Sequence, residues 1–189
     1  MDPVEQQRRR ELLLAPKMIS LTRYVGKLRD QVSGKIPDFD PLDGGAEARV
    51  LMLLEKPGPQ AAASGFVSRN NPDPTAKAIY EFSKAANIPR ELSCLWNTIP
   101  AWNETTTLNA TERNKGISYL GGLLGILPSL RAIILIGNNA QLAEKYIQNL
   151  KGPSFPIIKS AHPAMRVRNR YPEKWHQIPK EWEKVLNYL

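Results

Sequence analysis

Short apolar runs that alternate with helical patterns constrain the fold of this chain most strongly. The run at 50–54, Val-Leu-Met-Leu-Leu, contains no polar residue, which is typical of a strand covered on both faces. Further runs lie at 92–96, 132–136 and 155–158. Because helical patterns separate these runs, we predict right-handed crossovers and an α/β fold of three αβα layers, with a central, mostly parallel four-stranded sheet.

Capping residues and apolar spacing predict where the helices lie. Asp73 followed by Pro74 is typical of a helix start, and Asn109 with Glu112 resembles a capping box. The predicted helices cover 4–32 with a break near Pro16, 73–87, 109–127, 139–150 and 179–189. We expect one domain over 1–189, with 1–33 as a helical N-terminal extension.

Composition narrows the classes of partner and compartment. The 189 residues carry a formal net charge of +8, which favours polyanionic partners. Cys94 is the only cysteine, so an intramolecular disulfide and a four-cysteine metal site are both excluded. The charged N-terminus has no apolar stretch of secretory length, so we expect a cytoplasmic protein without a membrane partner. We also expect the protein to be a monomer.

The unusual segments of the sequence follow the predicted strands. These are the Glu-Lys-Pro-Gly-Pro segment at 55–59, the segment at 97–100, the segment at 137–139, and the loop that contains His162. In a parallel sheet, ligands bind beyond the carboxyl ends of the strands. We therefore expect these segments to build one cleft.

The segment at 160–170, Ser-Ala-His-Pro-Ala-Met-Arg-Val-Arg-Asn-Arg, concentrates several kinds of chemistry in one predicted loop. It holds one of the two histidines, two apolar side chains of wedge size and three arginines. Such a loop suits contact with the bases and backbone of a nucleic acid. The alternative is a solvated loop.

Removal of a base from DNA needs a pocket for the extruded base, an aromatic face, a polar edge reader and stabilisation of the departing anion. Phe66 could supply the aromatic face, Asn97 could pair with the edge of uracil, and a neutral His162 could donate to the base. The alternatives are a loop anchor for Phe66 and a buried capping amide for Asn97.

The sequence resembles the uracil-DNA glycosylase superfamily. The resemblance rests on four segments in order: Glu55 to Pro59, Gly65-Phe66-Val67, Asn97, and His162-Pro163. It implies that Phe66 stacks on the base, Asn97 reads its edge and His162 stabilises the anion. It also implies roles for the residues that flank these. Pro57 and Gly58 would line the pocket, Met165 or Val167 would act as a wedge, and Arg166, Arg168 and Arg170 would hold phosphates.

Two departures from the superfamily pattern stand out. Lys56 occupies the place where an Asp or Asn often positions the attacking water. The alternatives are that Glu55 does that work, that Lys56 acts as an amine nucleophile, or that Lys56 contacts phosphate or has a structural role. The cysteines of the iron-sulfur branches are missing, so we expect no metal and no cofactor.

Gly58 stands where some members carry a bulky aromatic, which suggests a roomier pocket. The alternative is that Gly58 serves a tight turn.

The functional expectation is a DNA repair enzyme. We expect it to flip uracil, or a related deaminated base, out of DNA and to hydrolyse its N-glycosidic bond in base excision repair. The alternative, favoured by Lys56, is a non-catalytic nucleic-acid-binding protein on the same fold. A small-molecule enzyme with this architecture is a third possibility, because one fold hosts many functions.

Overall fold

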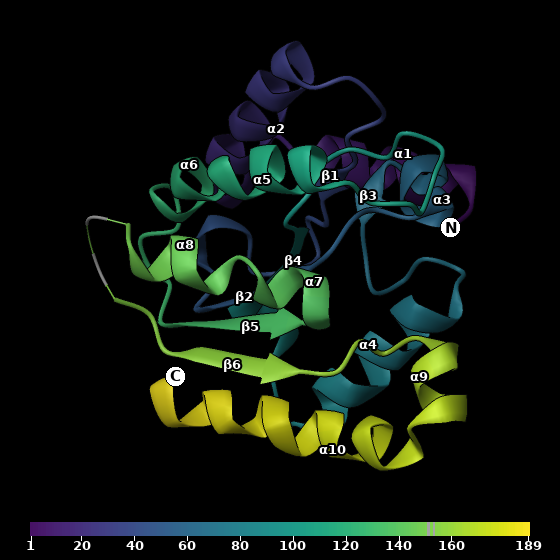
Figure 1. Cartoon of the computed structure of the whole chain (residues 1–189). Coiled ribbons are helices and arrows are strands. Elements are labelled where there is room, and N and C mark those ends of the chain that lie inside the picture. The colour runs from purple at the N-terminus through teal and green to yellow at the C-terminus, as the bar shows by residue number, and fades with distance from the viewer. Residues whose placement is uncertain (151, 153) are drawn as a thin grey trace.

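The computed structural model describes residues 1–150, 152 and 154–189. Its main sheet has, within these residues, four parallel strands in the order β4-β2-β5-β6 (Figure 1). Their bounds are β2 Val50–Leu54, β4 Ser93–Asn97, β5 Ala132–Ile136 and β6 Ile157–Ser160. The predicted parallel sheet is confirmed. The last strand begins later than predicted because Pro156 has no N–H to donate to the ladder.

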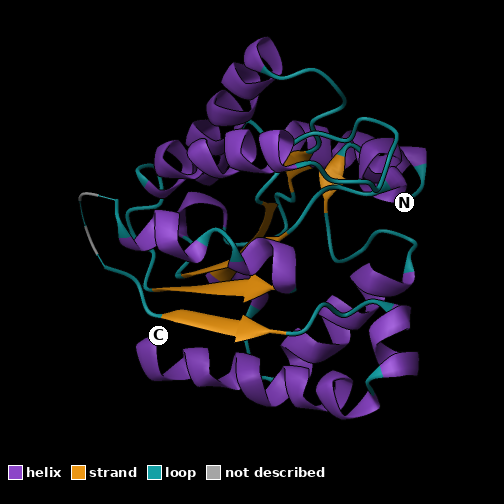
Figure 2. Cartoon of the chain, viewed as in Figure 1, coloured by secondary structure: helices purple, strands orange, loops and turns teal. Residues whose placement is uncertain are grey.

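Helices cover both faces of this sheet, so the predicted αβα layering is confirmed (Figure 2). One layer contains α10, Pro172–Glu183, which packs on β6, together with α4, Pro74–Ala85. The other layer contains α2 Ile19–Gln31, α5 Ala110–Ser118, α6 Leu120–Leu124, α7 Asn138–Gln141 and α8 Glu144–Gln148. Short 3-10 turns connect some elements: η1 Pro16–Met18, η2 Gly45–Glu47, η3 Arg90–Leu92 and η4 Lys184–Tyr188.

The N-terminal extension is helical and is interrupted at Pro16, as predicted. Helix α1 spans Pro3–Leu12 and its first turn is capped by the Asp2 carboxylate, which accepts from the Glu5 N–H at 2.9 Å. Helix α2 places Leu21, Val25 and Leu28 in the same buried cluster as the central strands. Among the described residues, no helix is long and apolar enough to cross a membrane.

Several elements differ from the prediction. A pair of two-residue parallel strands, β1 Asp38–Phe39 and β3 Phe66–Val67, and the short helix α3 Pro59–Ser64 were not predicted, because segments this short carry no readable period. The predicted helix at 109–127 is divided into α5 and α6 near two consecutive glycines, which are weak helix formers. The helix predicted over 139–150 is likewise two short helices.

The C-terminal helix begins earlier than predicted. Helix α10 starts at Pro172 and runs through Pro179, which the prediction took as the helix start. An internal proline costs about 3 kcal/mol. Trp175, Ile178 and Trp182 are buried along one face of α10, and the burial of such large side chains offsets that cost.

Candidate functional site

The carboxyl ends of the central strands meet at one edge, as expected for the segments that follow them. In the register of the sheet, Leu54 pairs with Asn97 and Ile136 pairs with Ser160. Backbone hydrogen bonds continue past the strands: the Thr98 N–H donates to the Leu54 carbonyl at 2.8 Å, and the Gly137 N–H donates to Ser160 at 2.9 Å. These bonds fix the positions of the loops that carry the candidate side chains.

A cavity of about 400 Å³ opens at this edge. This volume lies in the range of small-molecule sites. Among the residues proposed from sequence, it is lined by Lys56, Pro57, Gly58, Asn97 and His162. Other residues of its wall include Val67, Ser68, Asn71, Asp73, Pro74, Ile79, Leu95 and Thr106. Segments that follow β2, β4 and β6 therefore contribute to one concave site. The segment 137–139, which the sequence also predicted for this cleft, is not among the described residues that line it.

Asn97 is the last residue of β4, and its side chain faces this cavity. The residue is only 3% exposed. Within the described part of the chain, its amide makes no side-chain hydrogen bond and caps no helix. Among the described residues, the amide nitrogen and oxygen of Asn97 do not belong to the fully buried polar atoms without a partner, so a ligand or water in the cavity can reach them. The amide is therefore available to bind a polar edge in the cavity.

His162 follows β6 and contributes an imidazole to the same wall. Burial, assisted by the nearby positive charge of Arg166, lowers the pKa of His162 to about 4, so the ring is neutral at pH 7. Its Nδ1 atom is buried and has no hydrogen-bond partner among the described residues. A neutral imidazole has one N–H with which to donate.

The absence of a side chain at Gly137 leaves room for the His162 ring. The Gly137 φ of +87° is in a region that favours glycine, and a Cβ added there would lie 3.0 Å from the His162 Cβ. Any larger residue at position 137 would therefore push against the imidazole.

Lys56 is held in an ion pair inside the cavity wall. Its side chain is 4% exposed, and Nζ donates to Glu112 Oε1 at 2.8 Å and also to Asn103 Oδ1. Glu112 lies in the first turn of α5, where the Asn109 side chain accepts from its N–H. The sequence singled out Glu112 only as half of a capping box. Nothing in the sequence pointed to its pairing with a lysine far away along the chain.

Two residues proposed from sequence lie elsewhere. Among the described residues that line the cavity, neither Glu55 nor Phe66 is included. Glu55 is turned to Asn139, whose Nδ2 donates to its carboxylate. Phe66 is only 1% exposed in β3, beside the cavity-lining Val67. Neighbouring residues of a strand point to opposite faces, so the Phe66 ring is directed away from the cavity.

The arginine-rich segment is not a loop throughout. Residues 165–170 form a short helix, α9, because the Ala164 carbonyl accepts from the Val167 and Arg168 N–H groups. Met165 is 40% exposed at its start. Val167 is partly exposed, and Arg166, Arg168 and Arg170 are all exposed. The proposed wedge and phosphate contacts therefore lie on the surface of a helix next to the cavity.

Sequence reasoning missed two buried polar residues of the wall, Ser68 and Asn71. The Ser68 hydroxyl is held by the buried Asp40 carboxylate, which also accepts from Arg9 Nη1 at 2.7 Å. Asn71 Nδ2 donates to the Phe66 carbonyl at 2.9 Å, while its Oδ1 has no partner among the described residues. Serine and asparagine in a loop are common, so the sequence carried no signal for either.

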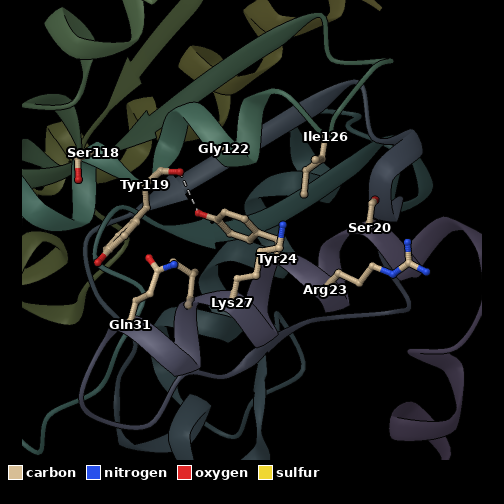
Figure 3. A pocket seen from close by; sticks show the side chains of 10 residues that line it. Ser20, Arg23, Tyr24, Lys27, Gln31, Ser118, Tyr119, Gly122 and Ile126 are labelled. Carbon is tan, nitrogen blue, oxygen red and sulfur yellow. Dashed lines mark hydrogen bonds between the residues drawn. The ribbon is translucent and has the colours of Figure 1, made fainter.

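A separate cavity of about 470 Å³ lies between α2 and the α5–α6 segment (Figure 3). Its wall includes Arg23, Tyr24 and Lys27 from α2, and the Tyr24 hydroxyl donates to the Tyr119 carbonyl at 3.2 Å. None of the residues proposed from sequence lines this cavity within the described part of the chain. The candidate site is therefore the cavity at the carboxyl edge of the sheet.

Comparisons with known proteins give no family. No family model matches the sequence, and no curated protein matches it. Among solved structures, the chain is similar to a variant of mimivirus UNG in complex with UGI, with 18% sequence identity and a TM-score of 0.43. That similarity covers 82% of this chain and 72% of the viral chain.

Proposed function

We propose that this protein is a DNA glycosylase that flips uracil, or a related deaminated base, out of DNA and hydrolyses its N-glycosidic bond. One observation carries the proposal: the unpartnered amide of Asn97 and the neutral imidazole of His162 line one cavity at the carboxyl edge of a parallel sheet. The first can read the edge of a base, and the second can stabilise the charge that its departure creates.

The proposed chemistry divides the work between these side chains. The Asn97 amide accepts from the N3–H of uracil and donates to O4, while His162 donates to O2. When the glycosidic bond breaks, its electron pair moves to N1 and spreads onto O2, where the His162 hydrogen bond strengthens. A water molecule adds to C1′ of the sugar and releases its proton to solvent, and the uracil anion takes up a proton at N1 from solvent. The products are free uracil and an abasic site.

Lys56 contributes charge in this account. Lys56 is a residue of the cavity wall, and its positive charge, although paired with Glu112, favours a departing uracil anion over the neutral base. Because Lys56 is paired with Glu112, it takes neither the place of a general base nor that of a phosphate contact. Glu55 is not on the cavity wall in the described residues, so activation of the water by its carboxylate has no support from the geometry.

DNA would bind across the cavity mouth. The exposed arginines of α9, Arg166, Arg168 and Arg170, suit contacts with phosphates, and Met165 or Val167 suits a wedge that takes the place of the flipped base. The net charge of +8 favours this polyanionic partner. Stacking by Phe66 requires that base binding uncover the ring, which is buried here.

Gly58 supports a substrate range beyond uracil. Its φ is −96°, a value open to any residue, and an added Cβ would meet no atom within 4 Å. Neither a tight turn nor a close approach therefore requires glycine at this position. The absence of a side chain leaves space in the cavity wall, which suits bases that carry an extra methyl group or a second ring.

The test is base release by single variants. Asn97→Ala and His162→Ala should each lower kcat/KM for uracil release by about 100-fold, because each removes hydrogen bonds aimed at the base. Asn187→Ala and His176→Ala change exposed residues of the same types and should retain wild-type rates. Full activity in folded Asn97→Ala and His162→Ala proteins would contradict the proposed site.

The pairing of Lys56 with Glu112 also favours the alternative, a non-catalytic DNA-binding protein, because position 56 offers no carboxylate or amide to the water. This alternative predicts binding of uracil-containing DNA that weakens steeply with salt, without release of the base. Binding and release measured on the same oligonucleotides separate the two functions.

A further inference from the structure

A further cavity, of about 570 Å³, opens beside the proposed base pocket, between α4 and α9. The two cavities share Asn71, Asp73 and Pro74, so a wall only one short segment thick separates them. The remaining lining comes from Pro72, Lys77, Ala78, Glu81, Met165, Arg168 and Trp175. Helices α4 and α9 indeed lie side by side where the chain leaves β6 (Figure 1).

The wall offers flat and apolar surfaces. The Arg168 guanidinium lies 5.9 Å from the centre of the Trp175 ring, which restrains this otherwise exposed side chain. Met165 lies at the start of α9, the helix that carries Arg168, and is 40% exposed. Guanidinium planes and apolar side chains are surfaces on which unstacked bases pack.

The wall also offers a hydrogen-bond acceptor. Asn71 uses its Nδ2 to donate to the Phe66 carbonyl, which fixes the orientation of the amide. Its Oδ1 is buried without a partner among the described residues. Asn71 lines both cavities, so an N–H group of a base that enters either one would satisfy this acceptor once the wall opens to it.

The charges of the wall balance, which argues for a neutral occupant. Lys77 and Arg168 are offset by Asp73 and Glu81, and Lys77 lies 3.9 Å from Glu81. The Asp73 carboxylate is occupied in capping α4, where it accepts from the Ala76 N–H. A phosphate gains little from a wall without net charge, whereas an uncharged aromatic ring fits it.

We propose that this second cavity, named here the neighbour pocket, holds the base adjacent to the one that is excised. The proposal rests on the proposed function and deepens it by naming the form of the substrate. Two adjacent bases must then leave the stack, which costs several kcal/mol more in a duplex than in a single strand. Single-stranded uracil-containing DNA is therefore the preferred substrate.

The experiment uses single-stranded oligonucleotides with one uracil. In two further oligonucleotides, the nucleotide on the 5′ or the 3′ side of the uracil is replaced by a tetrahydrofuran residue, which lacks a base. For the wild-type protein, kcat/KM should fall about tenfold for one of the two replacements, as expected for the loss of one stacked base.

Arg168→Lys tests the pocket, because it keeps the charge and loses the guanidinium plane. In this variant, kcat/KM for the intact oligonucleotide should fall about tenfold. Replacement of the neighbouring nucleotide by tetrahydrofuran should then lower kcat/KM little further. Arg170→Lys makes the same change on the same helix but outside the neighbour pocket. It should leave the ratio between the two oligonucleotides at its wild-type value.

Fluorescence anisotropy with the same oligonucleotides separates this proposal from the proposed function. Suppose that the wild-type protein binds the intact oligonucleotide more tightly than the one that lacks the neighbouring base, and that Arg168→Lys abolishes this difference. That result would support the neighbour pocket even if no uracil is released, and only the proposed function would then fail. Wild-type affinity and kcat/KM that change less than about twofold on removal of either neighbouring base would overturn the neighbour pocket. A ratio of kcat/KM between the intact and the tetrahydrofuran oligonucleotides that is the same in Arg168→Lys as in the wild-type protein would overturn the neighbour pocket as well.

Discussion

The ammonium of Lys56 lies 2.8 Å from the carboxylate of Glu112, and the two side chains are 4% and 20% exposed. This pair accounts for a lysine at a position where the resemblance leads one to expect Asp or Asn. An ammonium in an ion pair has no lone pair with which to attack a sugar. The geometry therefore favours an electrostatic role for Lys56 over a covalent one.

Borohydride trapping tests this conclusion. Because the Lys56 side chain is held in an ion pair with Glu112, incubation with uracil-containing DNA and sodium borohydride should give free uracil and no covalent protein–DNA adduct. Gel electrophoresis under denaturing conditions detects such an adduct. An adduct that forms with the wild-type protein and is lost in Lys56→Met would show instead that Lys56 acts as an amine nucleophile.

The lowered pKa of His162 predicts a pH dependence of stability. As pH falls below 6.5, the unfolded chain binds a proton at this residue, whereas the folded chain does so only near pH 4. The free energy of unfolding should therefore fall as pH drops through this window. Urea unfolding at several pH values should show a shallower fall in His162→Gln and an unchanged fall in His176→Gln.

The same shift predicts the pH profile of base release. Because His162 is neutral well below its ordinary pKa, kcat/KM should stay constant as pH falls through 6.5 and decline only towards pH 4. A decline centred at pH 6.5 that disappears in His162→Gln would mean that the ring titrates as an exposed histidine.

Arg9 ties the N-terminal extension to the wall of the base cavity. It is almost fully buried and donates to Asp40 at 2.7 Å and to Ser68 at 3.0 Å. Arg9→Ala should lower the free energy of unfolding by about 3 kcal/mol, because it removes the buried ion pair with Asp40, which then keeps Ser68 and Arg90 as side-chain donors. Arg10→Ala, an exposed neighbour, should change it by less than about 0.5 kcal/mol in the same urea titration. Equal effects of the two substitutions would contradict this role for Arg9.

Gly137→Ala should displace the His162 imidazole, since the added Cβ would lie 3.0 Å from the His162 Cβ. We expect kcat/KM to fall by about 100-fold, the scale of a misplaced catalytic group. Gly26→Ala in α2 adds a Cβ that meets no atom within 4 Å and should keep full activity. Thermal unfolding checks that both proteins are folded, and an active Gly137→Ala protein would remove His162 from the site.

The sheet and its polar edge could be predicted because each central strand is an unbroken apolar run followed by an unusual segment. Asn97 and His162 were found in this way. The pairs that build the wall could not be predicted, because Lys56 meets Glu112, and Arg9 meets Asp40, only after the chain has folded. Helix α9 was taken as a loop, since its arginines give no apolar period.

Release of free uracil tests the central claim most directly. The protein is incubated with an excess of a single-stranded oligonucleotide that carries one uracil, and the free base is quantified by mass spectrometry beside the Asn97→Ala protein. The account predicts several turnovers of uracil release by the wild-type protein and about 100-fold slower release by the variant. Folded wild-type protein that binds the oligonucleotide and releases no uracil would contradict it.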